Sequence, residues 1–210
     1  MKIIGLTGPS GAGKGFCYGF FSKYDVPCID ADDIYHKLLI PPSACVNELV
    51  ENFGNVILNN SGEINRKILA EIVFSDQNGE KLKLLNSITH KYVLEKTQEL
   101  IEDYKKQEKT AVVVDAPLLF EASFDKFCDF SIAVISDCLT RVKRIMERDS
   151  ITEEAALMRI RSQKCDDFYT SRADYTVIND KDCASLEKQL KNIFINEQLT
   201  MRKEQLHEQS

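Results

Sequence analysis

The chain has 210 residues, 43% of them hydrophobic, which suits a single α/β domain with an inserted subdomain and requires no second large domain. Its formal net charge of −6 and its pI near 5.2 argue against nonspecific binding to nucleic acid or to an anionic membrane, because phosphate surfaces attract clustered lysine and arginine. Positive charge is expected only locally, around a small anionic ligand.

Apolar runs rich in β-branched residues alternate with longer amphipathic segments. This alternation is typical of a three-layer α/β fold, in which helices cover both faces of a parallel sheet. Five strands are predicted, over Lys2–Thr7, Val26–Ile29, Ala111–Asp115, Ser131–Ile135 and Tyr175–Ile178. Helices are predicted over Lys14–Lys23, Ala31–Leu39, Ser43–Phe53, Arg66–Phe74, Glu80–Lys105, Leu139–Arg148, Glu153–Gln163 and Ala184 to about Glu197.

The first predicted strand runs into a glycine-rich loop. Four residues separate Gly8 from Gly13 and Lys14 follows, which fits the first seven positions of the phosphate-loop pattern G-x-x-x-x-G-K-[S/T]. Glycines let backbone N–H groups approach a polyphosphate, the next helix adds the positive end of its dipole, and the lysine neutralises the terminal phosphates. A tight turn without a ligand is the alternative. We predict that the phosphates of a nucleotide bind at Gly8, Gly11, Ala12, Gly13, Lys14, Gly15 and Phe16.

The eighth position of this loop departs from the pattern. Gly15 stands where a serine or threonine hydroxyl usually contacts Mg²⁺, and Phe16 supplies no hydroxyl either. Magnesium must then be held through water and ATP, or by another side chain. Asp115 ends the third predicted strand and resembles the acid that orders magnesium through water, although capping a buried turn before Pro117 is an alternative role.

Carboxylates follow the second predicted strand, in the run Ile29 to Asp33. The carboxyl ends of parallel strands face the same crevice, so these side chains are expected on the side of the phosphate loop. A phosphoryl acceptor hydroxyl needs a carboxylate that orients it and accepts its proton, and we assign that role to Asp32. The alternative is that Asp30 or Asp32 caps the following helix.

About eighty residues with helical periodicity separate the second and third strands, far more than one crossover needs. We expect a helical insertion over about 31–106 that covers the active site and binds the acceptor, inserted into a core of 1–30 and 107–200. The cluster Asn59-Asn60-Ser61-Gly62 predicts a turn within the insertion.

Arg141, Arg144 and Arg148 are spaced by three and four residues, so a helix places them on one face. Beside bound ATP, such a stripe suits a lid over about 139–165 that excludes water and stabilises charge on the transferring phosphoryl group. Arginines on a helix usually face solvent, and that remains the alternative. Arg141 is the least secure of the three.

Seven cysteines occur without a C-x-x-C pair, and they are expected to be reduced and mostly buried. Such cysteine usage indicates a reducing compartment, so we expect a cytoplasmic protein. No apolar run approaches the roughly 18 residues of a membrane span. The polar segment Met201–Ser210 is expected to fray from the last helix. Oligomeric state is left open.

Several short segments occur in an order and at a spacing, over about 170 residues, that are specific enough to indicate a protein family. In chain order, the segments are Gly5 to Lys14, Ile29 to Asp32, Gly62 to Arg66, Val73-Phe74, Leu85 to His90, Asp115 to Glu121, Arg144 to Asp149, Gln163, Ala173-Asp174 and Asn179. Together they resemble the dephospho-coenzyme A kinase family. Lys91 departs from the proline that this family has after the histidine.

The resemblance implies a P-loop kinase that moves the γ-phosphoryl group of ATP to the ribose 3′-hydroxyl of dephospho-coenzyme A, the last step of coenzyme A synthesis. It implies catalytic roles for Lys14, Asp32 and Arg144, and ATP contacts for Arg144 and Arg148. It also places Arg66 and His90 beside the acceptor nucleotide. Without it, Arg66 is a solvated residue at a helix start and His90 a packed or surface histidine.

Two other functions remain open at this point. The amino-acid sequence of the phosphate loop is similar to that of cytidylate kinase, although nucleoside monophosphate kinases do not share the later segments in this order. The missing hydroxyl at Gly15 and Phe16 instead motivates a nucleotide-binding sensor with little turnover.

Overall fold

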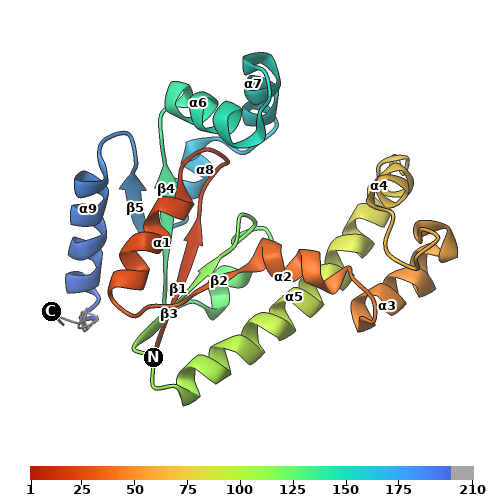
Figure 1. The fold of residues 1–210 in the computed structure, drawn as a ribbon, viewed down its shortest axis with the longest axis horizontal. Coiled ribbons are helices and arrows are strands. Elements are labelled where there is room, and N and C mark those ends of the chain that lie inside the picture. The colour runs from red at the N-terminus through yellow and green to blue at the C-terminus, as the bar shows by residue number, and fades with distance from the viewer. Residues whose placement is uncertain (200–210) are drawn as a thin grey trace, which may run out of the picture. The chain divides into compact units, whose positions relative to one another are not determined.

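The computed structural model describes residues 1–199, and within them five strands form one sheet (Figure 1). The strands are β1 (Lys2–Thr7), β2 (Cys28–Asp30), β3 (Ala111–Asp115), β4 (Phe130–Ile135) and β5 (Tyr175–Ile178). Their order across the sheet is β2-β3-β1-β4-β5, and the pairs β1–β3, β1–β4 and β4–β5 are parallel. The predicted five-stranded α/β sheet is confirmed.

Every predicted helix has a counterpart whose ends differ by no more than a residue or two, which is within the usual uncertainty of helix ends. The helices are α1 (Lys14–Lys23), α2 (Ala31–Leu38), α3 (Ala44–Phe53), α4 (Arg66–Phe74), α5 (Glu80–Lys106), α6 (Cys138–Asp149), α7 (Glu153–Arg161), α8 (Asp166–Thr170) and α9 (Cys183–Asn196). Helix α8 and the 3-10 helices η1 (Asn55–Ile57) and η2 (Phe124–Phe127) were not predicted, because so few residues show no period.

The second strand was predicted too early, over Val26–Ile29, and begins at Cys28 instead. The backbone N–H of Val26 donates to the carbonyl of Phe21 at 3.0 Å, so this residue closes the turn after α1. Pro27 has no N–H to donate, and its carbonyl accepts from the N–H of Val113 at 2.8 Å. The strand then continues to Asp30, whose side chain caps α2.

Side-chain caps explain why five of the helices begin where they do. In each, an oxygen of the residue before the helix accepts a hydrogen bond from a backbone N–H of the first turn, which satisfies a donor that the helix leaves unpaired. The capping residues are Asp30 for α2, Asn65 for α4, Asp137 for α6, Thr152 for α7 and Asp182 for α9.

Helices α1 and α9 lie side by side along one face of the sheet (Figure 1). Alternate residues of β1 such as Ile4 and Leu6 are buried in the same hydrophobic cluster as both helices, and the rings of Phe20 and Phe194 meet edge to face at 5.1 Å. On the opposite face, a Cβ at Gly5 would lie 2.9 Å from the side chain of Leu119, so the chain packs there directly on the strand.

The chain groups into two compact units, Met1–Ile29 with the residues from Asp103 onward, and Asp30–Glu102. The second unit is helical and has its own core, built around Leu49, Ile57 and Val73. Its predicted turn is confirmed, because the N–H of Gly62 donates to the carbonyl of Asn59 at 3.0 Å. The functional division into core, acceptor-binding insertion and lid stays a prediction.

The cysteines are free thiols, but the expectation that most are buried was wrong. Cys17 and Cys45 are buried, and burial raises the pKa of Cys17 to about 12. Cys138, Cys165 and Cys183 are exposed because they stand at the starts of α6, α8 and α9. The expected fraying of Met201–Ser210 lies outside the described residues. Within residues 1–199, no helix has the length and apolar character needed to cross a bilayer.

Candidate active site

The loop between β1 and α1 has a backbone that only glycine adopts readily. Gly8 has φ 141°, and a Cβ there would lie 2.1 Å from the carbonyl oxygen of Val134. Gly13 has φ 91°, and its Cβ would lie 2.3 Å from the side-chain nitrogen of Asn179. Positive φ and missing space both exclude larger residues, so the loop is held against the ends of β4 and β5.

The N-terminus of α1 is prepared for an anion. Gly13 is its N-cap residue and has no side chain to accept from the first-turn N–H groups, in contrast to the five capped helices. Lys14 begins the helix, and its Nζ donates to the carbonyl of Gly8 at 3.2 Å, which folds the ammonium back over the loop. Uncapped amides, a helix dipole and an ammonium together favour a phosphate chain.

Asp115 ends β3 beside this loop and is 8% exposed. Its Oδ1 lies 3.9 Å from the Nζ of Lys14, and its Oδ2 accepts a hydrogen bond from the hydroxyl of Tyr18 at 2.6 Å. The carboxylate and lysine predicted for nucleotide chemistry are therefore adjacent. Gly15 stands near them in open space, since a Cβ built there has nothing within 4 Å.

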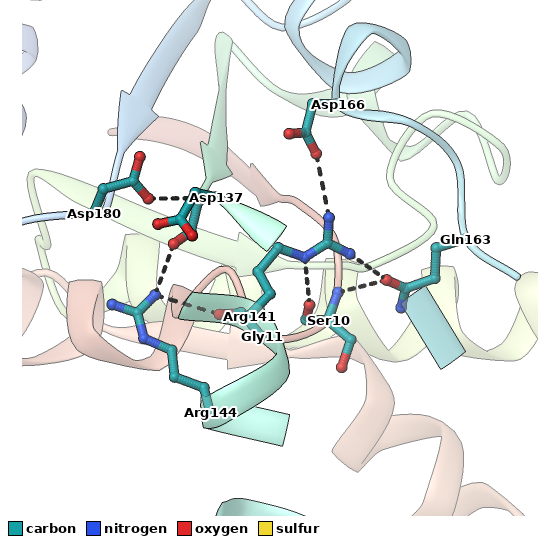
Figure 2. Close-up of polar contacts among 9 residues, drawn as sticks. Ser10, Gly11, Asp137, Arg141, Arg144, Gln163, Asp166 and Asp180 are labelled. Atoms are coloured by element: carbon teal, nitrogen blue, oxygen red, sulfur yellow. Dashed lines mark hydrogen bonds and ion pairs between the residues drawn. The ribbon is translucent and has the colours of Figure 1, made fainter. Parts of the chain in front are cut away.

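The guanidinium of Arg144 braces the phosphate loop from α6 (Figure 2). Its Nη1 donates to the carbonyls of Gly11 at 3.3 Å and Ala12 at 3.1 Å, and its Nη2 donates to the carbonyl of Asn179 at 2.9 Å. The ring of Phe16 lies 5.4 Å from the guanidinium carbon, in cation–π range. The catalytic role predicted for Arg144 stays a prediction, and this bracing is the role that its contacts establish.

Arg141, whose predicted role was the least secure of the three arginines, is the most deeply buried of them. It is 5% exposed, and its Nε donates to the carbonyl of Ser10 at 3.0 Å (Figure 2). Its Nη2 donates to Oε1 of Gln163 at 2.8 Å, and the same oxygen accepts from the N–H of Ser10 at 3.2 Å. Asp166 lies 3.4 Å from its Nη1. Gln163 and Arg141 thus hydrogen-bond to the backbone N–H and the carbonyl of Ser10, respectively.

Arg148 lies on the same helix but is mainly exposed. Its Nη2 reaches the hydroxyl of Ser10 at 3.2 Å, while its Nε donates to Asp149 at 2.8 Å. Hydrogen bonding from Arg148, supported by Arg159, lowers the pKa of Asp149 to about 2. The predicted ATP contact of Arg148 is untested, but its guanidinium does lie at the loop.

Asn179 is a site residue that sequence reasoning noted only as a marker. It follows β5, is 4% exposed, and its Nδ2 donates to the carbonyl of Ala12 at 2.9 Å. Its position shortly after a parallel strand was the available signal, because such strand ends meet at the ligand edge of the sheet. Arg141 was predicted only as the least secure of three arginines on one helix face, and Tyr18, which was missed, carried no such signal.

Three predicted acceptor residues belong to the second unit. Asp30 is the N-cap of α2, and its Oδ1 accepts from the N–H groups of Asp32 and Asp33, so the capping alternative holds for Asp30 and not for Asp32. Burial raises the pKa of the half-buried Tyr35, nearby Arg66 opposes that rise, and Asp32 adds to it. Asp32 and Arg66 therefore both lie within electrostatic range of one phenol.

His90 lies in α5 and is half-buried, and burial lowers its pKa. Its contact with the acceptor, and the orientation of Asp32 toward the phosphate loop, stay predictions. Among residues 1–199, no group of three or more His, Cys, Asp or Glu side chains forms a metal cage. A magnesium ion carried by phosphates needs only one or two carboxylates, so the absence of such a cage does not test the predicted role of Asp115.

Comparison with known protein families identifies the family of this chain. A family model described as dephospho-CoA kinase matches residues 2–185. The chain belongs to the dephospho-CoA kinase family. The family member from Fusobacterium nucleatum is 39% identical over 190 residues, which cover 90% of this chain and 95% of that protein.

Solved structures agree with this assignment. The dephospho-CoA kinase from Campylobacter jejuni is 27% identical, with a TM-score of 0.64 over 92% of this chain and 96% of that one. The structure titled TT1252 from Thermus thermophilus is 28% identical, with a TM-score of 0.75 over 93% of this chain and 97% of its own. The P-loop kinase fold expected from the motifs is confirmed.

Proposed function

We propose that this protein transfers the γ-phosphoryl group of ATP to the ribose 3′-hydroxyl of dephospho-coenzyme A, giving coenzyme A and ADP. Membership of the family supports the reaction. The single structural observation that carries it is the uncapped start of α1, where Gly13, Lys14 and Asp115 surround the place for a phosphate chain. We place the reaction in the cytoplasm, where ATP is made and free thiols persist.

The phosphate loop would hold the donor by its backbone. The N–H groups at the start of α1 would bind phosphate oxygens, and Lys14 would neutralise charge that develops on the terminal phosphates. Lys14 already lies over the loop through its bond to the carbonyl of Gly8. Arg144 would keep the loop in shape through three backbone carbonyls, and Arg148 would add positive charge beside Ser10.

The acceptor side would depend on Asp32 and Arg66. Asp32 would orient the 3′-hydroxyl and accept its proton as the oxygen bonds to phosphorus. The guanidinium of Arg66 would bind an anionic group of the acceptor, and it lies within electrostatic range of the phenol of Tyr35 in the same unit. His90, kept neutral by its lowered pKa, would donate or accept a hydrogen bond without adding charge.

The residues beside Lys14 fit Mg²⁺. The carboxylate of Asp115 stands at the end of β3, and hard oxygen ligands are those that magnesium prefers. When bound, magnesium supplies charge neutralisation on the β- and γ-phosphates. Asp115 would hold it through water, and nothing at Gly15 would crowd it.

Acceptor dependence tests the proposal. Purified protein with ATP and Mg²⁺ is assayed for ADP release with dephospho-coenzyme A, and separately with CMP, UMP or AMP. We expect release only with dephospho-coenzyme A, and the product's mass and phosphorus NMR spectrum should place the new phosphate on the 3′-oxygen. Coenzyme A, whose 3′-oxygen already carries phosphate, is the matched control and should give none.

Other results would select the competing functions. Turnover with a monophosphate and none with dephospho-coenzyme A would point to a nucleoside monophosphate kinase. Tight ATP binding without product at any magnesium concentration would point to a nucleotide sensor, the function that the missing hydroxyl at Gly15 suggested.

A further inference from the structure

The phosphate loop lacks the hydroxyl that its pattern requires, but a different hydroxyl of the same helix reaches Asp115, the acid proposed to hold Mg²⁺. Positions 15 and 16 hold glycine and phenylalanine, whereas Tyr18 lies three residues beyond Gly15 in the same helix. Helical residues three apart are neighbours on one face, so Gly15 and Tyr18 share a face of α1. The phenol of Tyr18 donates to Oδ2 of Asp115 at 2.6 Å.

The direction and length of the tyrosine side chain suit this contact. The Cα–Cβ bonds of a helix tilt toward its N-terminus, so a side chain at position 18 leans back toward the phosphate loop. Three residues of helix separate the two positions by about 4.5 Å along the axis, and the phenol is long enough to span that offset. The ring is fixed because it packs against the hydrophobic core beneath β1 and α1.

The hydrogen bond has the properties of a positioning contact. A distance of 2.6 Å is typical of a hydroxyl that donates to an ionised carboxylate, which is among the stronger hydrogen bonds in proteins. Asp115 is 8% exposed, so water competes little for its oxygens. Lys14 lies 3.9 Å from the other oxygen, at ion-pair distance, so the hydroxyl of Tyr18 is on one side of the carboxylate and an ammonium is on the other.

We propose that Tyr18, from the next turn of α1, compensates for the missing P-loop hydroxyl by supporting the magnesium site through Asp115. It is a positioning residue that holds Asp115 in the orientation needed for Mg²⁺ bound to nucleotide, and Gly15 leaves the adjoining space open. The inference rests on the proposed use of magnesium-ATP. It does not depend on which acceptor receives the phosphoryl group.

Calorimetry on the full chain tests this role without turnover. The affinity for a non-hydrolysable ATP analogue is measured with Mg²⁺ and with EDTA, and the ratio of the two affinities is the magnesium-dependent gain. We expect Tyr18→Phe, which keeps the packed ring, to reduce this gain about tenfold and to leave the affinity in EDTA unchanged. Tyr24→Phe, at the buried C-cap of the same helix, is the control and should keep the wild-type gain.

A double-mutant cycle tests whether the Tyr18 hydroxyl compensates for the missing hydroxyl at position 15 or has only a structural role. Gly15→Ser restores the hydroxyl at its usual position, where a Cβ meets nothing within 4 Å. We expect Gly15→Ser to increase the magnesium-dependent gain much more in the Tyr18→Phe background than in the wild-type background. Equal effects in both backgrounds would mean that the two hydroxyls act independently, and would overturn the proposal.

Three further outcomes would also overturn it: an unchanged gain in Tyr18→Phe, equal losses of affinity with Mg²⁺ and with EDTA, or failure of Tyr18→Phe to fold. The last two would assign the hydroxyl a structural role. These measurements use no acceptor, so they are independent of the proposed reaction. If the cycle gives the expected result but the wild-type protein does not phosphorylate dephospho-coenzyme A, the proposed function is refuted and the role of Tyr18 stands.

Discussion

The Nε of Arg141 donates to the carbonyl of Ser10 at 3.0 Å, across 131 positions of sequence. The contact ties the first turn of α6 to the middle of the phosphate loop, and Gln163 closes it from the other side through the N–H of Ser10. The shape of the loop is thus set by residues of the C-terminal half of the chain. Disturbing them should affect both stability and nucleotide binding.

Arg141→Met should lower the free energy of unfolding by about 2 kcal/mol or more, because the carbonyl of Ser10 and the amide oxygen of Gln163 each lose a charged donor. Chemical denaturation measures the change. Arg148→Met is the control, since its side chain is 58% exposed and its loss should cost no more than about 0.5 kcal/mol. Equal effects of the two variants would contradict a bracing role for Arg141.

Gly13→Ala should abolish tight ATP binding and lower the melting temperature, because the new Cβ meets Asn179 and the backbone has φ 91°. Gly19→Ala is matched to it within α1, where a Cβ meets nothing within 4 Å. That control should stabilise the protein by about 0.5–1 kcal/mol, the usual penalty of a glycine inside a helix. Thermal unfolding with and without ATP distinguishes the two.

Asp32→Asn should reduce kcat about 10²-fold or more with little change in the melting temperature, because it removes the proposed proton acceptor and keeps the backbone. Asp33→Asn, its exposed neighbour that pairs with Lys37, should retain nearly full activity. Steady-state kinetics with dephospho-coenzyme A makes the comparison. Full kcat in Asp32→Asn would exclude this carboxylate as the base.

The stability of the protein should fall as the pH decreases below the usual pKa of histidine, near 6.5, in part through His90. Burial lowers the pKa of this side chain in the folded state, so in that window the unfolded chain binds a proton that the folded chain does not, and acid favours unfolding. His90→Gln should therefore lose less melting temperature between pH 7.5 and 5.5 than the wild type.

Local patterns predicted the sheet and the phosphate loop well. The spacing of Gly8, Gly13 and Lys14 is a local feature whose chemistry does not depend on the rest of the chain, and β-branched runs identify central strands because both faces of such strands are buried. The second strand was misplaced because Val26 is apolar and β-branched, yet its N–H closes the turn after α1. Apolar character alone does not separate these two uses of a valine.

The contacts that complete the site were beyond prediction from spacing. Ser10 and Gln163 are 153 positions apart, and Tyr18 and Asp115 are 97 apart, so no periodicity links them. The sequence did predict a helical face for the three arginines, but it could not reveal that Arg141 is buried and Arg148 exposed. That difference arises because α6 starts at the end of β4, next to the loop.

The central place of β1 in the sheet has a consequence for the order in which the protein matures on the ribosome. The segment that grips phosphate is synthesised first, but the strands on either side of β1 are β3 and β4, which begin at Ala111 and Phe130. Until those residues leave the exit tunnel, β1 has no neighbouring strand, and the glycine loop lacks the residues against which it packs. Nucleotide binding therefore cannot stabilise the nascent chain early in synthesis. It can do so only once most of the chain has been made.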